Sequence, residues 1–384
     1  MFPFAKKWLC PFCCESFAPH EAYFRCTFSG CLGRIPDTPY SRVSGSKDVL
    51  RMGRVLIPGK KRMLPGMYCD SCKQLATLRI CPRCHSELPQ DIGQVDQYFF
   101  LLFGSKGSGK THYLASLITQ LQREVGPRMK MTVRPLGEPA RLRWNKTYAP
   151  LFEQQKALAA TKSAETDPLG QYPLSFRFTL EQRNGAKKTV NVGFFDTSGA
   201  DFTSDSAVLK RYMHQVHGIL FLIDPCSITT VRDMLGQQSS PTMTQATLEE
   251  YPLLLKDTFV SERILRPSEK VKIPVALTLT KMDLVWPHLY SGSPLLRPVT
   301  YSGGDIAKRL QSISTEVSSL LASWIGLQFT QTMRSEFHTY AYFGGSALGK
   351  PVEDPYKPVI ANPLHVEDPL LWLLSQLHIL KDTK

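Results

Sequence analysis

The stretch FLLFGSKGSGKTHYLASL, residues 100–117, carries the strongest fold signal in this chain of 384 residues. An apolar run over 98–103 predicts a buried strand, and a helical pattern begins directly after a glycine-rich octet. The octet fits the pattern G-x-x-x-x-G-K-S/T and consists of Gly104, Ser105, Lys106, Gly107, Ser108, Gly109, Lys110 and Thr111. Such a loop turns backbone N–H groups towards phosphates, while Lys110 can reach the outer phosphates and the Thr111 hydroxyl can bind Mg²⁺. The octet therefore predicts a phosphate-binding loop, the alternative being a glycine-rich turn without a ligand.

Outward from this loop, apolar strands alternate with helical stretches, a pattern typical of an α/β domain. The expected strands lie near 98–103, 174–180, 188–195, 217–223, 273–279 and 337–343. Asn184-Gly185 lies between the second and third strands and is a strong hairpin signal, so these two strands run antiparallel. The sequence predicts a mostly parallel six-stranded sheet with one antiparallel hairpin strand.

The sequence predicts where three of the helices begin. One begins at Lys110, and a second covers about 305–333 because apolar residues recur there at helical spacing. The last has Asp368 as its N-cap and Pro369 at its first helical position. The stretches 127–172 and 225–270 mix Pro, Gly and Ser with amphipathic pieces and are expected to be insertions in the domain over 95–384.

Nine of the ten cysteines lie within the first 84 residues. Cys69, Cys72, Cys81 and Cys84 form two C-x-x-C pairs, and two such turns can complete a tetrahedral zinc shell. A looser cluster, Cys10, Cys13, Cys26 and Cys31, also begins with C-x-x-C. We expect two structural zinc sites in residues 1–90, with a different pairing of the clusters left open. A disulfide scaffold would need an oxidising compartment, and a redox dithiol would explain only one pair.

The charge of the chain is strongly basic, with a formal net charge of +13, and residues 1–95 hold 14 Lys and Arg against 7 Asp and Glu. This balance is compatible with a nucleic-acid partner, although it also fits a solvated surface or an acidic protein partner. No apolar run reaches the about 18 to 20 residues of a membrane-spanning helix. The N-terminus lacks the apolar core of a secretory signal, so we expect a cytoplasmic protein.

Further short motifs follow the predicted strands. These are DTSG with Asp196 and Gly199, TKMD with Thr280, Lys281 and Asp283, and SAL with Ser346, Ala347 and Leu348. Together with the octet and a threonine in the 161–166 region, they resemble in order and placement the signature elements of the Ras-like GTPases of the TRAFAC class. The resemblance covers residues 98–350 and implies a Ras-like P-loop GTPase fold that binds GTP or GDP with Mg²⁺.

The chemistry of these positions agrees with the resemblance. Asp196 at a strand end can hold a Mg²⁺-bound water, and the Gly199 N–H can meet the γ-phosphate. The Asp283 carboxylate can accept hydrogen bonds from guanine N1–H and its 2-amino group, which adenine does not offer. The Lys281 stem would lie along the base, and an N–H near Ala347 would donate to guanine O6.

Three points bear on the hydrolysis that this resemblance implies. Ala200 stands where many GTPases have a glutamine that orients the attacking water, so hydrolysis should be slow. Lys106 lies inside the loop and could act as a cation beside the γ-phosphate, or else point to solvent. The switch threonine is expected to be Thr161, with Thr166 as the alternative.

The whole layout resembles bacterial double-GTPase families of conflict or defence gene clusters, in which zinc ribbons precede a TRAFAC GTPase domain. The quoted segments are CPFC, CPRCHSELP, GSKGSGKT, DTSGADF, TKMDL and VEDPLLWLL. This resemblance implies partner proteins, among them a second GTPase and an effector. Three alternatives remain: a Walker-type ATPase with Asp224 on Mg²⁺, a nucleotide-regulated nucleic-acid-binding module, and a pseudo-GTPase that binds without turnover.

Overall fold

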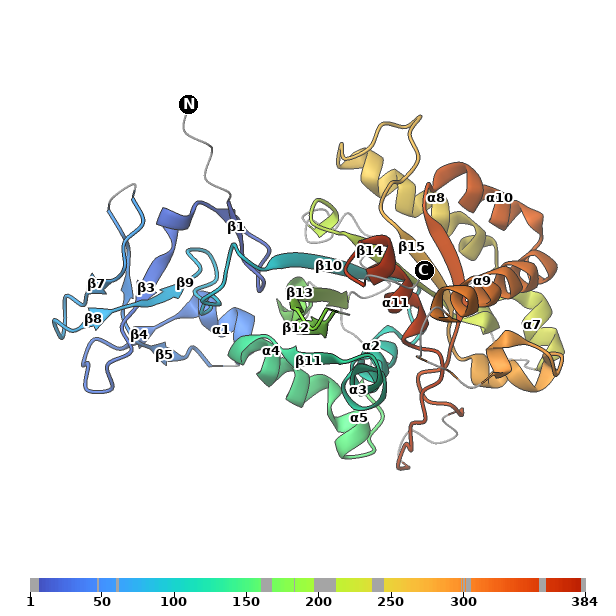
Figure 1. Cartoon of the computed structure of the whole chain (residues 1–384), viewed down its shortest axis with the longest axis horizontal. Coiled ribbons are helices and arrows are strands. Elements are labelled where there is room, and N and C mark those ends of the chain that lie inside the picture. Colours follow the sequence, from blue (N-terminus) through green and yellow to red (C-terminus); the bar gives the residue numbers. More distant parts are fainter. Residues whose placement is uncertain are drawn as a thin grey trace.

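A seven-stranded sheet forms the centre of the chain, in the order β11-β12-β13-β10-β14-β15-β16 (Figure 1). The computed structural model describes residues 7–46, 48–59, 62–159, 168–182, 184–196, 212–236, 245–297, 299, 301, 305–351 and 357–380. The strands are β10 (Asp96–Phe103), β11 (Met131–Pro135), β12 (Leu174–Glu181), β13 (Lys187–Asp196), β14 (Gly218–Ile223), β15 (Val275–Leu279) and β16 (Tyr340–Gly344). Strand β12 runs antiparallel to both of its neighbours, and the other pairs are parallel. The six predicted strands are confirmed, and the predicted total of six is wrong by one.

The additional strand, β11, lies in the stretch predicted to be an insertion. Met131 and Val133 are buried while Thr132 and Arg134 are exposed, so the period-two pattern is only four residues long before Pro135, the last residue of the strand. So short a pattern between two helical pieces is not a usable strand signal. The strand pairs antiparallel with β12 over Met131–Pro135 and extends the sheet at its edge.

The central strand β10 determines where a ligand can bind. Residues 99–103 are fully buried, as expected for a parallel strand that is covered on both faces. From β10 the chain passes to the edge strand β11 and returns through β12 to β13, which lies beside β10. It then crosses to β14 on the other side of β10. The carboxyl end of β10 is therefore a topological switch point, the place where open α/β sheets leave a crevice for ligands.

The helices are α2 (Lys110–Gln120), α3 (Gly126–Arg128), α4 (Gly137–Arg143), α5 (Pro150–Glu153), α7 (Thr229–Met234), α8 (Gln245–Ser261), α9 (Asp305–Trp324), α10 (Leu327–Glu336) and α11 (Asp368–Gln376). The single helix predicted over 305–333 is wrong, because Gly326 has a φ of 106° and separates α9 from α10. The predicted N-cap is also displaced by one residue, since Glu367 precedes α11 and Asp368 is its first helical residue. Within the described ranges, no helix is long and apolar enough to cross a membrane.

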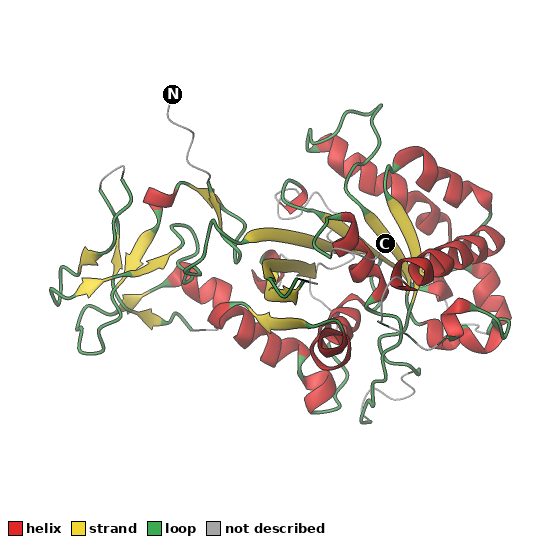
Figure 2. Cartoon of the chain, viewed as in Figure 1, coloured by secondary structure: helices red, strands yellow, loops and turns green. Residues whose placement is uncertain are grey.

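The described part of residues 8–80 forms short strands, one α-helix and a 3-10 turn, Pro19–Glu21, at one end of the molecule (Figure 2). The elements are β1 (Trp8–Leu9), β2 (Ser16–Phe17), β3 (Tyr23–Arg25), β4 (Ile35–Pro36), α1 (Thr38–Ser44), β5 (Arg51–Met52), β6 (Val55–Leu56), β7 (Met67–Tyr68), β8 (Leu75–Ala76) and β9 (Leu78–Ile80). This region contacts β12, because Ser175 Oγ donates to the Pro11 carbonyl at 2.5 Å. Arg177 of β12 also pairs at 2.6 Å with Asp91, which lies between β9 and β10. Two small apolar clusters that include the cysteines form its core.

Candidate nucleotide site and cysteine clusters

The glycine-rich octet forms the turn between β10 and α2. Gly104 has a φ of 152°, and a Cβ atom there would lie 2.2 Å from the Leu222 carbonyl oxygen, so only glycine fits. Lys110 is buried, and its Nζ donates to the carbonyl oxygens of Gly104 and Ser105 at 2.8 Å each. The lysine side chain thus curls back over the loop, which places its ammonium where the predicted phosphate groups would bind.

Asp196, the last residue of β13, lies beside the start of α2. Thr111 Oγ1 donates to Asp196 Oδ2 at 3.0 Å, and the Tyr148 hydroxyl donates to the same oxygen at 3.1 Å. The other carboxylate oxygen, Oδ1, is buried without a hydrogen-bond partner in the described part of the chain. Burial raises the pKa of Asp196, while the charges of Arg143 and Lys110 counteract that rise. A hydroxyl and a carboxylate with one unsatisfied oxygen form an oxygen donor set that fits Mg²⁺.

The TKMD and SAL motifs meet at the ends of β15 and β16. Ser346 Oγ donates to Asp283 Oδ1 at 2.5 Å and accepts the Gly349 N–H at 2.8 Å. Thr280 Oγ1 donates to the Ile223 carbonyl at 3.1 Å, which fixes the start of the motif to β14. Lys281 has a left-handed φ of 52°, and its ammonium lies 2.6 Å from Asp224 Oδ2. The acid that meets Thr111 is thus Asp196, whereas Asp224 pairs with Lys281.

One cavity of about 510 Å³ joins these motifs. It is lined by Lys106, Gly107, Ser108, Gly109, Lys110 and Thr111 from the octet, by Thr280, Lys281 and Asp283, and by Ser346, Ala347 and Leu348. Its volume lies within the range of about 300–1,000 Å³ that is usual for small-molecule sites. The octet, the TKMD motif and the SAL motif are far apart in the sequence, and the fold brings them together around one cavity. Gly199, Thr161 and Thr166 lie outside the described residues.

Three further contributions were not expected from the sequence. His112 lines the cavity, and its Nε2 accepts the Leu158 N–H at 3.1 Å; burial lowers the pKa of this histidine. Leu158 itself, with its neighbours 157 and 159, forms another wall. Tyr148 reaches Asp196 from a π-helical turn, Trp144–Tyr148. His112 directly follows the octet and could have been proposed from that position, but no sequence pattern marks Tyr148 or Leu158.

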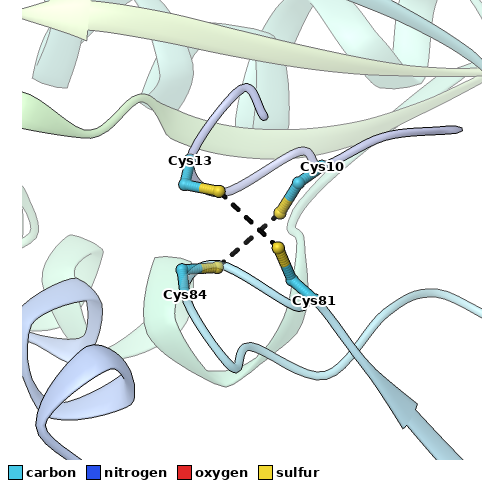
Figure 3. Close-up of side chains that lie close together, drawn as sticks. All are labelled: Cys10, Cys13, Cys81 and Cys84. Atoms are coloured by element: carbon cyan, nitrogen blue, oxygen red, sulfur yellow. Dashed lines mark hydrogen bonds between the residues drawn. The ribbon is translucent and has the colours of Figure 1, made fainter. Parts of the chain in front are cut away.

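Eight of the ten cysteines form two groups of four, and Cys14 and Cys226 belong to neither group. In the proximal cluster, Sγ of Cys10 lies 3.7 Å from Sγ of Cys84, and Sγ of Cys13 lies 3.7 Å from Sγ of Cys81 (Figure 3). In the distal cluster, the Sγ atoms of Cys26 and Cys72 lie 3.6 Å apart, and the Sγ atoms of Cys31 and Cys69 lie 3.9 Å apart. Zn–S bonds of about 2.3 Å in a tetrahedron place sulfur atoms about 3.8 Å apart. Each cluster therefore has the geometry of a Cys₄ zinc site.

This grouping corrects the predicted ligand sets, which were Cys69, Cys72, Cys81 and Cys84 in one site and Cys10, Cys13, Cys26 and Cys31 in the other. The reason is the antiparallel pairing of β3 with β9, in which Tyr23 lies opposite Ile80 and Arg25 lies opposite Leu78. Cys26 follows β3 and Cys81 follows β9, so the pairing carries these two cysteines to opposite ends of the ladder. The distal cluster is nested within the proximal one along the chain.

Comparisons with known proteins give distant likenesses, among them one curated protein and one solved structure. No protein-family model matches the chain. A curated protein of Mycolicibacterium smegmatis, described as the putative ESX-1 scaffolding and assembly protein SaeC, is 25% identical over 165 residues, which are 42% of this chain and 42% of that protein. The chain thus spans less than half of the length of this relative. Among solved structures, the Arl6 BBS3 small GTPase from Trypanosoma brucei with bound GppNp matches 74% of this chain and 99% of its own, with 12% identity and a TM-score of 0.30.

The fold and the site together define the general class of this protein. The chain is an α/β protein with a mostly parallel sheet, a phosphate-loop motif at the switch point of that sheet, and two Cys₄ clusters with zinc-site geometry.

Proposed function

We propose that this chain is a GTP-binding switch that hydrolyses GTP slowly to GDP with Mg²⁺. The observation that carries the proposal is that Asp283 and the phosphate loop line the same cavity, while Ser346 fixes the Asp283 carboxylate from one side. A purine at Asp283 would leave its phosphates directed towards Lys110 and the N-terminus of α2. Guanine supplies two donors to a carboxylate in this position, and adenine would leave that carboxylate unpaired.

The phosphate end of the site would act mainly by electrostatics. Lys110 would release the loop carbonyls and neutralise the phosphate oxygens, while Thr111 and Asp196 would hold the metal. Mg²⁺, when bound, supplies charge neutralisation between the outer phosphate groups. We also propose Gly199 as an N–H donor to the γ-phosphate and Thr161 as the switch threonine. Ala200 offers no group to orient water, so turnover should be slow unless Lys106 or a partner contributes.

The decisive experiment measures binding of GDP, ADP and xanthosine diphosphate by calorimetry. The wild-type chain should prefer GDP, and Asp283→Asn should prefer xanthosine diphosphate, because an amide donates where the carboxylate accepts. A wild-type preference for ADP would contradict the proposal and favour the Walker-type ATPase. In that case Asp224→Asn should abolish the Mg²⁺ dependence, although Asp224 is paired with Lys281 in the structure.

The remaining parts of the proposal concern partners. We propose that residues 1–90 form a zinc-ribbon region and recruit proteins to the GTPase domain over 95–384, in a bacterial conflict, defence or signalling system. A second GTPase and an effector are the proposed partners, and the cytoplasm is the proposed location. The relative from Mycolicibacterium smegmatis is described as a scaffolding and assembly protein, which is compatible with a role in assembly. Nucleic-acid binding would instead reveal itself by a steep salt dependence.

A further inference from the structure

A segment near the C-terminus lies along the SAL motif. We call residues 357–366 the C-terminal strap. The Ser346 N–H donates to the Leu364 carbonyl and the Leu364 N–H donates to the Ser346 carbonyl, both at 2.9 Å. The Asn362 N–H donates to the Leu348 carbonyl, also at 2.9 Å. The residue that holds the Asp283 carboxylate is thus itself paired, through its backbone, with the strap.

The strap and the SAL segment are in direct backbone contact at both ends of the motif. A Cβ atom at Gly345 would lie 3.0 Å from the carbonyl oxygens of Leu364 and His365. A Cβ atom at Gly349 would lie 2.2 Å from the Asn362 carbonyl oxygen, and Gly349 has a φ of 74°. Side chains at these two glycines would push the strap away, so the close approach is a built feature of the sequence.

The same strap is bound to the helix that follows the phosphate loop. The hydroxyl of Tyr113, a fully buried side chain of α2, donates to the Val366 carbonyl at 2.6 Å. About two turns further along α2, Gln120 Nε2 donates to the Pro363 carbonyl at 3.0 Å. The strap is therefore held by hydrogen bonds to α2 on one side and to the SAL motif on the other.

A buried ionic cluster holds the end of the strap. Arg309 of α9 donates two hydrogen bonds to the Asp368 carboxylate, at 2.6 and 2.8 Å, and His365 Nδ1 lies 2.9 Å from the same carboxylate. The Tyr301 hydroxyl donates to Glu367. His365, Glu367 and Asp368 are at most 3% exposed. Removing one partner of such a cluster leaves uncompensated buried charge, so the cluster resists displacement of the strap.

We propose that the C-terminal strap, fixed by the Arg309–Asp368–His365 cluster, sets the base specificity of the nucleotide site. The strap positions Ser346 and thereby the Asp283 carboxylate, so Asp368, Arg309 and Tyr113 are positioning residues. This inference rests on the proposed guanine-binding function and assigns its selectivity to a segment that contains none of the base-contacting side chains.

The first test uses Tyr113→Phe, which removes one hydroxyl and keeps the ring that lines the cavity. Affinities for GDP, ADP and inorganic pyrophosphate are measured with Mg²⁺, and amide exchange is followed at Ser346 and Leu364. The ratio of GDP to ADP affinity should fall about fivefold, as for loss of one hydrogen bond, while pyrophosphate affinity stays within about twofold. Tyr342→Phe on β16 is the control, since it removes the same atom from a side chain that lies against Tyr340.

The second variant, Asp368→Asn, removes a charge from the buried cluster and should lower the same ratio by more than Tyr113→Phe. If Asp368→Asn does not fold, Tyr113→Phe still decides the question. Faster exchange at Ser346 and Leu364 with an unchanged GDP-to-ADP ratio would overturn the inference, as would a parallel loss of pyrophosphate affinity. A wild-type chain without any preference for GDP would instead refute the proposed function itself.

Discussion

Tyr148 donates a hydrogen bond of 3.1 Å to Asp196 Oδ2, the carboxylate oxygen that also accepts the Thr111 hydroxyl. The phenol is fully buried, and its ring stacks on Trp144 at a centroid distance of 5.7 Å. A side chain from outside the sequence motifs therefore fixes the carboxylate that is proposed to hold the metal. The orientation of Asp196 depends on the packing of residues 144–148 as well as on the phosphate loop.

Tyr148→Phe should weaken GDP binding in the presence of Mg²⁺ by roughly tenfold, because a hydrogen bond to a charged group contributes about 1.5–3 kcal/mol. Binding without Mg²⁺ should change little. Calorimetric titration of GDP with Mg²⁺ and with a chelator measures both values. Equal losses under the two conditions would show that the phenol supports the fold rather than the metal position.

Pairs of Cys→Ser substitutions should distinguish the nested grouping from pairing in sequence order. Cys10→Ser with Cys81→Ser removes two ligands from one cluster, and the protein should keep about one zinc ion of two. Cys10→Ser with Cys26→Ser disrupts both clusters, and both ions should be lost or weakened. Zinc content by elemental analysis gives the answer, and the opposite pattern would support the sequence-order pairing.

Asp37 connects Arg25 at 2.7 Å with His85 at 2.9 Å inside the cysteine-rich region. Burial alone would raise the pKa of Asp37, but His85, the Tyr40 N–H and Arg25 outweigh it and lower the pKa to about 2. The stability from this ionised carboxylate is therefore present above its ordinary pKa of 3.8 and is lost as pH falls towards 2. At pH 7, Asp37→Asn should lower the free energy of unfolding by about 3 kcal/mol, as for other broken buried ion pairs. Denaturant unfolding of the zinc-loaded protein measures this, and a change below about 1 kcal/mol would contradict it.

Gly104→Ala should abolish nucleotide binding and lower the melting temperature, because the added Cβ atom meets the Leu222 carbonyl at 2.2 Å and forces β10 and β14 apart. Gly185→Ala is a matched control. Gly185 also has a positive φ, 77°, but a Cβ atom there would have no neighbour within 4 Å. The control should cost only about 1 kcal/mol of backbone strain and leave GDP affinity unchanged. Similar effects of both substitutions would show that the positive φ alone causes the loss, and that the contact with the Leu222 carbonyl does not contribute.

Lys106→Ala tests whether the loop itself supplies a cation for hydrolysis. Lys106 is exposed and lines the cavity. If its ammonium stabilises charge on the γ-phosphate, single-turnover GTP hydrolysis should slow by about tenfold or more. GTP affinity, measured separately, shows whether binding has changed instead. An unchanged single-turnover rate would remove Lys106 from the catalytic set.

The sequence was sufficient for the features that are local. The apolar runs of β10, β13, β14, β15 and β16 are long enough to be recognised, and their motifs follow at the strand ends because the carboxyl ends of parallel strands share one edge. The break between two helices and the additional strand were harder to predict from the sequence. Gly326 interrupts an otherwise continuous helical pattern, and β11 has only two buried alternating residues.

Long-range pairing could not be read from spacing. The grouping of cysteines depends on how β3 pairs with β9, and identical C-x-x-C turns carry no information about that register. The contact of Tyr148 with Asp196 depends on the packing of a π-helical turn, and the strap meets the SAL motif through backbone atoms. Backbone atoms are the same in every residue, so such contacts cannot be recognised from residue types. The only sign of them in the sequence is the glycines that permit the close approach.

If both cysteine clusters hold zinc, as proposed, their nested arrangement would set the order in which the N-terminal region acquires it. The distal cluster closes chain separations of 38 and 46 residues, whereas the proximal cluster closes 68 and 74. During synthesis, Cys72 leaves the ribosome before Cys81, so the inner site can trap zinc first. That event shortens the span that the outer thiolates must still bridge, which lowers the entropy cost of closing them. Occupancy of the outer site should therefore depend on prior filling of the inner one, and a cell poor in zinc would accumulate chains that lack the metal next to β12.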